Sequence, residues 1–249
     1  PAVTVAVDAN RRRGMRRLLA LPDDERPQVV LLDDAFQHRY VRPSLSILAT
    51  DCHRLFTRDH LLPVGTLREP RSGVRRADLV VVNKCDPAMK PIDSRIIEDE
   101  MRIDMSRPSF FTSIAYRQLE GVWPEECPGR ELSSLKPDTD VLLVAGIADP
   151  TPLVEEMRRH TEKTVALTFP DHHAFRRSDI DKIRAALAKL SPDALIVCTE
   201  KDAARLRTTP LFPSDWHART YALPIEITFL FGAAARFDEL VTATWKPMK

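Results

Sequence analysis

Apolar residues along this chain gather in short runs, and stretches with the apolar spacing of an amphipathic helix lie between them. In the first half, the apolar runs predict strands at 3–7, 29–32, 45–49 and 78–83. Helical spacing follows the first and the last of these runs, at 11–21 and 96–103. Strands that alternate with helices are typical of βαβ units and of a buried parallel sheet.

The second half repeats the alternation, which predicts a second and smaller α/β lobe. Its expected strands and helices are at 141–146, 152–160, 164–169, 180–190 and 194–199. Two more apolar segments, 109–123 and 221–231, are expected to pair as a two-stranded connector between the lobes. A last helix near 233–245 would return to the first lobe. We therefore predict an α/β fold with one lobe over 1–125 and another over 126–249.

Composition and net charge exclude only a few classes of protein function. The chain has 249 residues and a formal net charge of +1, which does not indicate a nucleic-acid partner. Its four cysteines form no CxxC pair, so neither a zinc site nor a disulfide framework is expected, and a reducing cytoplasm is the simplest location. No apolar run approaches the roughly 20 residues that span a bilayer. Pro1 stands directly before an apolar run, which suggests a fragment that begins within a domain.

An acidic pair follows the second apolar run, because Asp33 and Asp34 come directly after 29–32. In an open α/β sheet, ligands bind at the carboxyl ends of strands. Two carboxylates there suit Mg²⁺ beside nucleotide phosphates, as in a Walker B strand, since Mg²⁺ takes few protein carboxylates and keeps several waters. Gln37 and His38 bring further polar groups next to the pair. The alternative is that Asp33 or Asp34 only caps the following turn or helix.

A loop that contains Pro and Gly and precedes the next predicted strand carries four arginines. They are Arg68, Arg71, Arg75 and Arg76. Guanidinium forks suit phosphoryl oxygens, although a solvated basic loop is the alternative interpretation. The end of that strand matches the NKxD motif, with which GTPases recognise the guanine base, at Asn83, Lys84 and Asp86.

Polar groups also follow two strands of the second half. One set lies where a strand gives way to a helix and consists of Thr199, Glu200, Lys201 and Asp202. Capping of that helix is the simplest interpretation, and contact with a nucleotide is the alternative. The other set is Asp171, His172 and His173 in FPDHHAF, where an Asp/His pair could transfer protons, bind a metal or cap a helix.

Taken together, DDAFQHR, LPVGTLREP, VVNK, FPDHHAF and TEKDA occur in an order and spacing that resemble the tetraacyldisaccharide 4'-kinase (lipid A 4'-kinase) family. The sequence of the DDAFQHR motif is similar to that of the Bacteroidetes branch of the family. The resemblance implies a P-loop NTPase-like lobe and an enzyme that uses ATP and Mg²⁺. Its substrate would be the lipid disaccharide tetraacyldisaccharide 1-phosphate, phosphorylated on the 4'-hydroxyl to give lipid IVA. It also implies a peripheral location at the cytoplasmic face of the inner membrane, with no nucleic acid and no obligate protein partner.

The resemblance assigns roles to particular residues of the first lobe. Asp33 and Asp34 would hold the metal, and Arg68 would neutralise charge on the transferred phosphoryl group or the donor. Gln37 and His38 would complete the site. Ala35 stands where many relatives have glycine, which does not weaken the kinase interpretation.

In the second lobe, the resemblance assigns His172 to support the catalytic base, with Asp171 beside it, and the segment 199–202 to contact the nucleotide. No G-x-x-x-x-G-K-[ST] segment occurs in the sequence, so these residues alone are expected to be inactive and poorly folded in the first lobe. Two alternatives remain at this stage. One is a GTPase or metallochaperone-like P-loop protein, and the other is a non-catalytic nucleotide-binding module.

Overall fold

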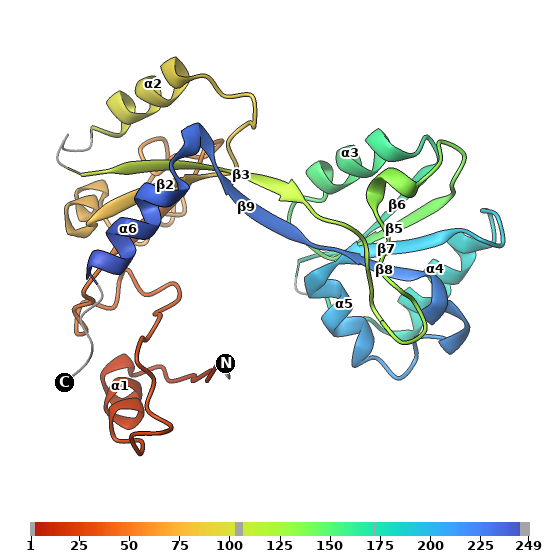
Figure 1. The fold of residues 1–249 in the computed structure, drawn as a ribbon, viewed down its shortest axis with the longest axis horizontal. Coiled ribbons are helices and arrows are strands. Elements are labelled where there is room, and N and C mark those ends of the chain that lie inside the picture. The colour runs from red at the N-terminus through yellow and green to blue at the C-terminus, as the bar shows by residue number, and fades with distance from the viewer. Residues whose placement is uncertain (1–2, 103–106, 172, 245–249) are drawn as a thin grey trace. The chain divides into compact units, whose positions relative to one another are not determined.

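The computed structural model describes residues 3–102, 107–171 and 173–244, and these form alternating helices and strands (Figure 1). The α-helices are α1 (Arg11–Leu19), α2 (Pro91–Met101), α3 (Thr151–His160), α4 (Arg177–Leu187), α5 (Glu200–Arg207) and α6 (Ala234–Thr244). The strands are β1 (Ile47–Asp51), β2 (Leu79–Asn83), β3 (Ser109–Tyr116), β4 (Glu120–Gly121), β5 (Val141–Ala145), β6 (Thr164–Thr168), β7 (Leu195–Thr199), β8 (Thr220–Leu223) and β9 (Ile225–Phe229). The predicted α/β class is confirmed.

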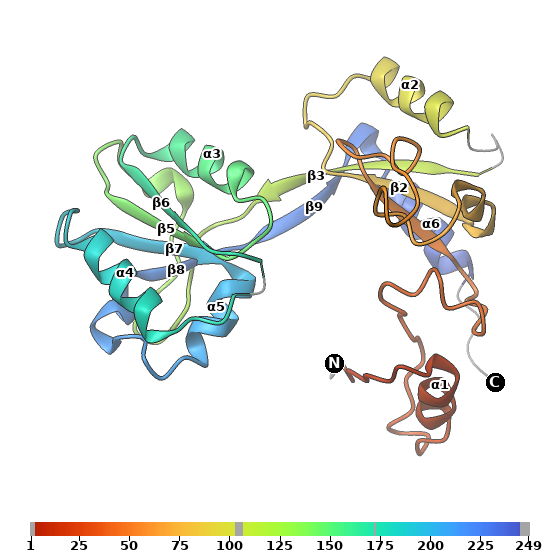
Figure 2. The ribbon, with the colours of Figure 1, turned by 180° about the vertical axis from the view of Figure 1, so that it is seen from behind.

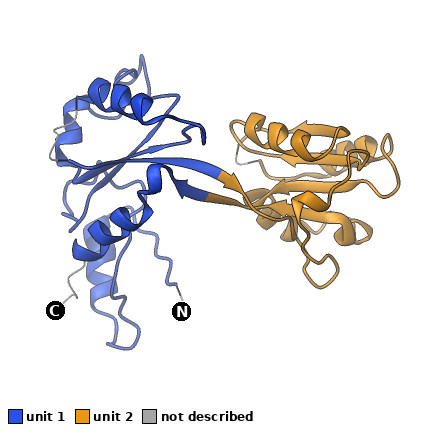
Figure 3. Ribbon diagram, turned by 45° about the horizontal axis from the view of Figure 1, so that its top comes forward, with its two compact units in different colours: residues 1–114, 227–249 blue, residues 115–226 orange. Residues whose placement is uncertain are grey.

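The chain divides into two compact units (Figure 3). Unit 1 contains residues 1–114 and 227–249, and unit 2 contains residues 115–226. The chain leaves unit 1 within β3 and returns to it within β9, and these two strands are hydrogen-bonded neighbours in one sheet. The sequence placed a single boundary at 125/126, whereas the contacts divide the chain inside these two strands.

Unit 2 is a five-stranded sheet of order β4-β8-β7-β5-β6 with helices on both faces (Figures 1 and 2). Its pairs are parallel except for the antiparallel β4 and β8. Side chains of β5 alternate between the faces: Leu142 and Val144 pack with α4 and α5, while Val141, Leu143 and Ala145 pack with α3. Apolar residues on both faces explain why this central strand reads as a continuous apolar run.

Unit 1 contains a four-stranded sheet of order β1-β2-β3-β9, in which β1, β2 and β3 are parallel. The same alternation covers both faces of β2. Val80 and Val82 belong to a cluster with Ile97 of α2, whereas Leu79 and Val81 pack near Phe237 of α6. The last helix of the chain therefore completes the core of the first unit.

Capping residues in the sequence explain where helices α1 and α2 begin. Asn10 caps α1, because its side-chain oxygen accepts a hydrogen bond of 3.1 Å from the backbone N–H of Arg13. Helix α2 begins at Pro91, and the carboxylate of Asp93 accepts a hydrogen bond of 3.0 Å from the backbone N–H of Lys90.

Two predicted strands are wrong. Residues 3–7 and 29–32 have no strand pairing, and most of their apolar side chains are exposed, with Val7 at 95% and Leu31 at 91%. A strand requires a neighbour for its backbone N–H and C=O groups, and neither segment has one among the described residues. Asp33 and Asp34 consequently follow a segment that is not a strand of the sheet, and they lie in a turn.

Candidate functional site

In unit 1 the structure brings the acidic pair and the arginine loop together. The Nη1 of Arg68 lies 3.0 Å from the Oδ2 of Asp34, and both side chains are exposed. Asp34 has a φ of 46°, in the left-handed region that Asp adopts more readily than most residues. An exposed ion pair stabilises a fold by about 1 kcal/mol at most, so this contact matters for where the two groups lie and not for stability.

Arg76 holds the same loop through more contacts than Arg68 makes. Its Nη2 donates a hydrogen bond of 3.1 Å to the backbone oxygen of Phe36, and its guanidinium lies 4.6 Å from the centre of the Phe36 ring. The same Nη2 is 2.6 Å from Oε1 of Glu69. In the sequence, Arg76 is one of several basic residues of the loop, because spacing cannot distinguish an arginine that supports a loop from one that faces solvent.

Gln37 and His38 lie in the turn after the acidic pair, and both are exposed. The backbone N–H of His38 donates to the oxygen of Ala35 at 2.8 Å. His38 also lines a concavity of about 560 Å³ at the start of α1, together with Ala9, Asn10, Arg11, Arg12 and Tyr40. The DDAFQHR turn and the NRRR segment are thus neighbours in space, which the sequence did not predict.

The carboxylates of Asp33 and Asp34 can supply part of a magnesium site. Both side chains are exposed, and carboxylate oxygens are donors that Mg²⁺ accepts. No cluster of three or more His, Cys, Asp or Glu side chains suited to a metal occurs within the described residues. Mg²⁺ commonly binds one or two protein carboxylates with waters and phosphates completing its shell, so the donor set fits that ion.

In unit 2, Thr199 caps α5. Its side chain accepts a 3.1 Å hydrogen bond from the backbone N–H of Asp202 and donates one of 2.7 Å to that residue's Oδ2. The Asp202 carboxylate is fully buried and also accepts from the N–H of Gly146 at 2.8 Å and from Arg205 at 2.8 Å. Asp202 therefore ties the end of β5 to the end of β7 and has a structural role. Only Glu200 and Lys201 are exposed enough for a nucleotide contact.

The FPDHHAF turn follows β6 in the same unit. Asp171 is exposed, and His172, a predicted catalytic residue, lies outside the described residues. His173 is 2.8 Å from the buried carboxylate of Asp179 through its Nε2. The sequence assigned no particular role to His173, and the signal that could have predicted its partner was Asp179, the third residue of α4, directly before the predicted helix at 180–190.

The NKxD-like residues serve the fold of unit 1. The Oδ1 of Asn83 accepts a 2.7 Å hydrogen bond from Thr112, and Nζ of Lys84 lies 2.7 Å from Oδ2 of Asp51. Burial raises the pKa of Asp51, but hydrogen bonds from Lys84 and from backbone N–H outweigh it, and the net shift is downward. These contacts explain the residue types without a guanine base.

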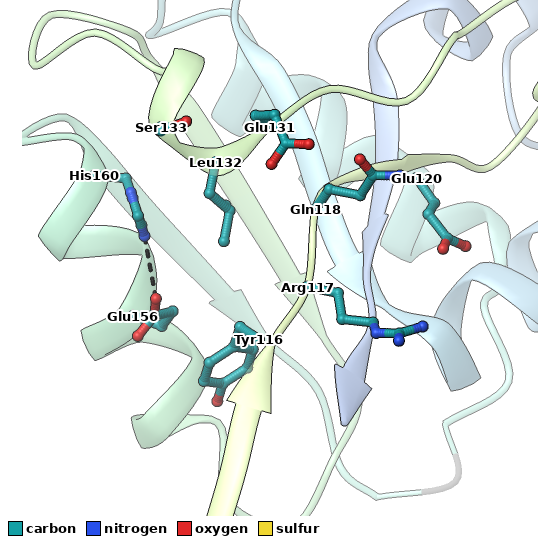
Figure 4. A pocket seen from close by; sticks show the side chains of 9 residues that line it. All are labelled: Tyr116, Arg117, Gln118, Glu120, Glu131, Leu132, Ser133, Glu156 and His160. Atoms are coloured by element: carbon teal, nitrogen blue, oxygen red, sulfur yellow. Dashed lines mark hydrogen bonds and ion pairs between the residues drawn. The ribbon is translucent and has the colours of Figure 1, made fainter. Parts of the chain in front are cut away.

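A separate concavity of about 570 Å³ lies in unit 2 (Figure 4). Its lining residues are Tyr116, Arg117, Gln118, Glu120, Glu131, Leu132, Ser133, Glu156 and His160. His160 is hydrogen-bonded to Glu156 at 3.1 Å. Burial, followed by the nearby charge of Glu156, raises the pKa of Tyr116 to about 12, so its hydroxyl stays protonated. None of the residues singled out in the sequence lines this concavity.

Comparison with known proteins gives the family. The family model of tetraacyldisaccharide-1-P 4'-kinase matches residues 1–246. A tetraacyldisaccharide 4'-kinase of Parabacteroides distasonis is 52% identical over 97% of this chain and 66% of its own length. One of Bacteroides thetaiotaomicron is 44% identical over 96% of this chain and 64% of its own length. The chain thus spans slightly less than two thirds of these relatives.

A solved structure supports the fold. The chain matches a crystal structure of LpxK from Aquifex aeolicus in complex with ATP, with a TM-score of 0.61 and 21% identity, over 94% of this chain and 61% of that one. At this identity the likeness concerns the fold. The family expected from the five ordered motifs is confirmed by the sequence matches, and the chain belongs to the tetraacyldisaccharide-1-P 4'-kinase family.

Proposed function

We propose that the protein transfers the γ-phosphoryl group of ATP to the 4'-hydroxyl of tetraacyldisaccharide 1-phosphate. The observation that carries the proposal is the family match over residues 1–246, with relatives of up to 52% identity that are named for this reaction. The contact between Arg68 and Asp34 supports it, because it joins the two motifs that such a reaction would need on one surface.

The chain's own residues would act on phosphate groups mainly through charge and orientation. Arg68 has an exposed guanidinium whose planar donors match phosphoryl oxygens. Asp33 and Asp34 would hold Mg²⁺, which when bound neutralises phosphate charge. Gln37 and His38 follow in the same turn and would orient the groups around that ion.

Proton transfer from the sugar hydroxyl would involve the FPDHHAF turn of unit 2. Asp171 is exposed there, and His172 follows it in the sequence. His172, with Asp171 beside it, would support the catalytic base, because an Asp/His pair can hold a base in the orientation and charge state that proton transfer requires. Exposed Glu200 and Lys201 at the start of α5 would contact the nucleotide.

The lipid substrate implies work at a membrane surface, and we propose a peripheral location at the inner membrane. Among the described residues, no helix combines the length and the apolar character needed to cross a bilayer.

The test is phosphoryl transfer by the full-length protein with labelled ATP, in competition with unlabelled ATP or GTP. We expect unlabelled ATP to compete at least tenfold better than GTP. His172→Ala should reduce kcat by about a hundredfold or more, because general base catalysis contributes about 10² to 10⁴ in rate. Preference for GTP, or a folded His172→Ala variant of normal activity, would contradict the proposal.

A further inference from the structure

The FPDHHAF turn is anchored on both sides of Asp171. Phe169, just after β6, is buried, and its backbone N–H donates a 2.8 Å hydrogen bond to the oxygen of Ala145 at the end of β5. Phe175 is buried on the other side. Asp171 is exposed between these two anchors, so the turn presents it to solvent from a fixed base.

His173 joins the two anchors. Its ring stacks on Phe169 with centroids 4.9 Å apart and planes 18° apart, and it meets Phe175 edge-on at 5.5 Å. Its Nε2 lies 2.8 Å from Oδ2 of Asp179. Two aromatic contacts and one hydrogen bond leave the imidazole a single orientation.

Asp179 is equipped to hold that imidazole. Its side chain is only 4% exposed, and its carboxylate also accepts hydrogen bonds from the backbone N–H of Arg176 at 3.0 Å and from Nζ of Lys182 at 3.2 Å. Burial raises the pKa of Asp179, but these hydrogen bonds and that of His173 outweigh burial and hold it at about 2. The carboxylate is therefore ionised and fixed at the start of α4.

Gly146, the residue that follows β5, packs close to His173. A Cβ added to Gly146 would lie 3.5 Å from the Cβ of His173 and 3.0 Å from Oδ1 of Asp202. Gly146 is thus packed between the Asp202 carboxylate and the histidine. Residues just after β5 and β6 and the start of α4 therefore pack around His173.

We propose that His173 is a positioning residue: its bond to Asp179 fixes the turn that carries Asp171 in the orientation needed for proton transfer. This inference rests on the proposed function, in which Asp171 takes part in that transfer. His173 itself touches no substrate in this account. It acts through the orientation of the turn.

The experiment compares His173→Ala, His173→Gln and Asp179→Asn in the full-length protein. The matched control is His217→Ala, because His217 is another histidine of unit 2 that stacks on an aromatic ring, Trp123 at 3.7 Å, and is bonded to a carboxylate, Glu126 at 3.0 Å. Two readouts are measured: kcat and KM for ATP, and amide hydrogen exchange of the segment 170–176.

We expect His173→Ala to lower kcat by about tenfold to a hundredfold with KM for ATP changed less than about twofold, since a small misplacement of a reacting group costs rates of this order. Hydrogen exchange of 170–176 should become faster. His173→Gln, which keeps a donor, should recover most of kcat, Asp179→Asn should resemble His173→Ala, and His217→Ala should leave kcat within about twofold.

Normal kcat in His173→Ala, or a loss no larger than that of His217→Ala, would overturn the inference. So would unchanged hydrogen exchange of the turn. If the wild-type protein transfers no phosphoryl group, the proposed function fails, and the exchange measurement still decides whether His173 anchors the turn.

Discussion

The Nη1 of Arg68 lies 3.0 Å from the Oδ2 of Asp34, although 34 positions separate the two residues in the sequence. This contact places the LREP arginine on the DDAFQHR turn. It therefore joins two motifs whose contact could not be predicted from the sequence. The pair is exposed, so its geometry bears on ligand binding more than on the stability of the unit.

The first prediction concerns Arg68. Arg68→Lys should reduce kcat/KM for ATP by about tenfold or more, because an ammonium cannot reproduce a planar two-point contact with phosphoryl oxygens. Its free energy of unfolding should stay within about 0.5 kcal/mol of the wild type, as expected for a surface position. Steady-state kinetics and urea unfolding measure the two effects. A large loss of stability with unchanged kinetics would contradict the assignment.

Arg76 should behave in the opposite way. Arg76→Ala removes the hydrogen bond to the Phe36 oxygen, the contact with the Phe36 ring and the ion pair with Glu69. We expect a loss of about 1 to 2 kcal/mol in the free energy of unfolding. The exposed neighbour Arg75 is the control, and Arg75→Ala should change stability by less than about 0.5 kcal/mol. Equal effects of the two variants would show that Arg76 does not hold the turn.

Asp202 offers a test of the structural role of the TEKD segment. Asp202→Asn should lower the free energy of unfolding by about 2 to 3 kcal/mol, because it leaves the guanidinium of Arg205 without the charge of its buried carboxylate partner. Lys201→Ala, at the exposed neighbouring position, should leave unfolding nearly unchanged. Thermal or urea unfolding decides, and an Asp202→Asn variant as stable as Lys201→Ala would argue against the structural role.

Acid should weaken unit 2 through Asp179. The folded state holds the pKa of Asp179 at about 2, below its ordinary value of 3.8. The stabilisation is therefore fully present above about pH 4 and is lost as the pH falls towards 2. Urea unfolding between pH 5 and pH 2.5 should show a steeper loss of stability for the wild type than for Asp179→Asn. Parallel curves would contradict the assignment.

Much of the fold could be predicted from the sequence because its strands carry their own signal. The runs at 141–146 and 194–199 are buried on both faces, and both they and the edge run at 164–169 pair within one sheet through β5, so β5, β6 and β7 appear close to the predicted positions. The runs at 3–7 and 29–32 have the same apolar character but no partner strand among the described residues. Whether a strand finds a partner depends on segments distant in the sequence, and the local apolar pattern contains no information about them.

The candidate site was harder to predict than the fold. Motif order identified the family, but it could not tell that the Asp202 carboxylate is buried or that Arg76 supports the acidic turn. It also left His173 without a role, because the bond to Asp179 depends on how the turn packs against the end of β5. Burial and side-chain partners are properties of packing, which residue spacing alone does not determine.

The most direct test of the central claim is to identify the product. The full-length protein is incubated with ATP, Mg²⁺ and tetraacyldisaccharide 1-phosphate, and ³¹P NMR of the purified lipid shows where phosphate has been added; Asp33→Ala is assayed beside it. We predict a second phosphate at the 4' position with the wild type and a large loss of product with the folded variant. An unmodified disaccharide after incubation with the wild type, or phosphate at another position, would contradict the account.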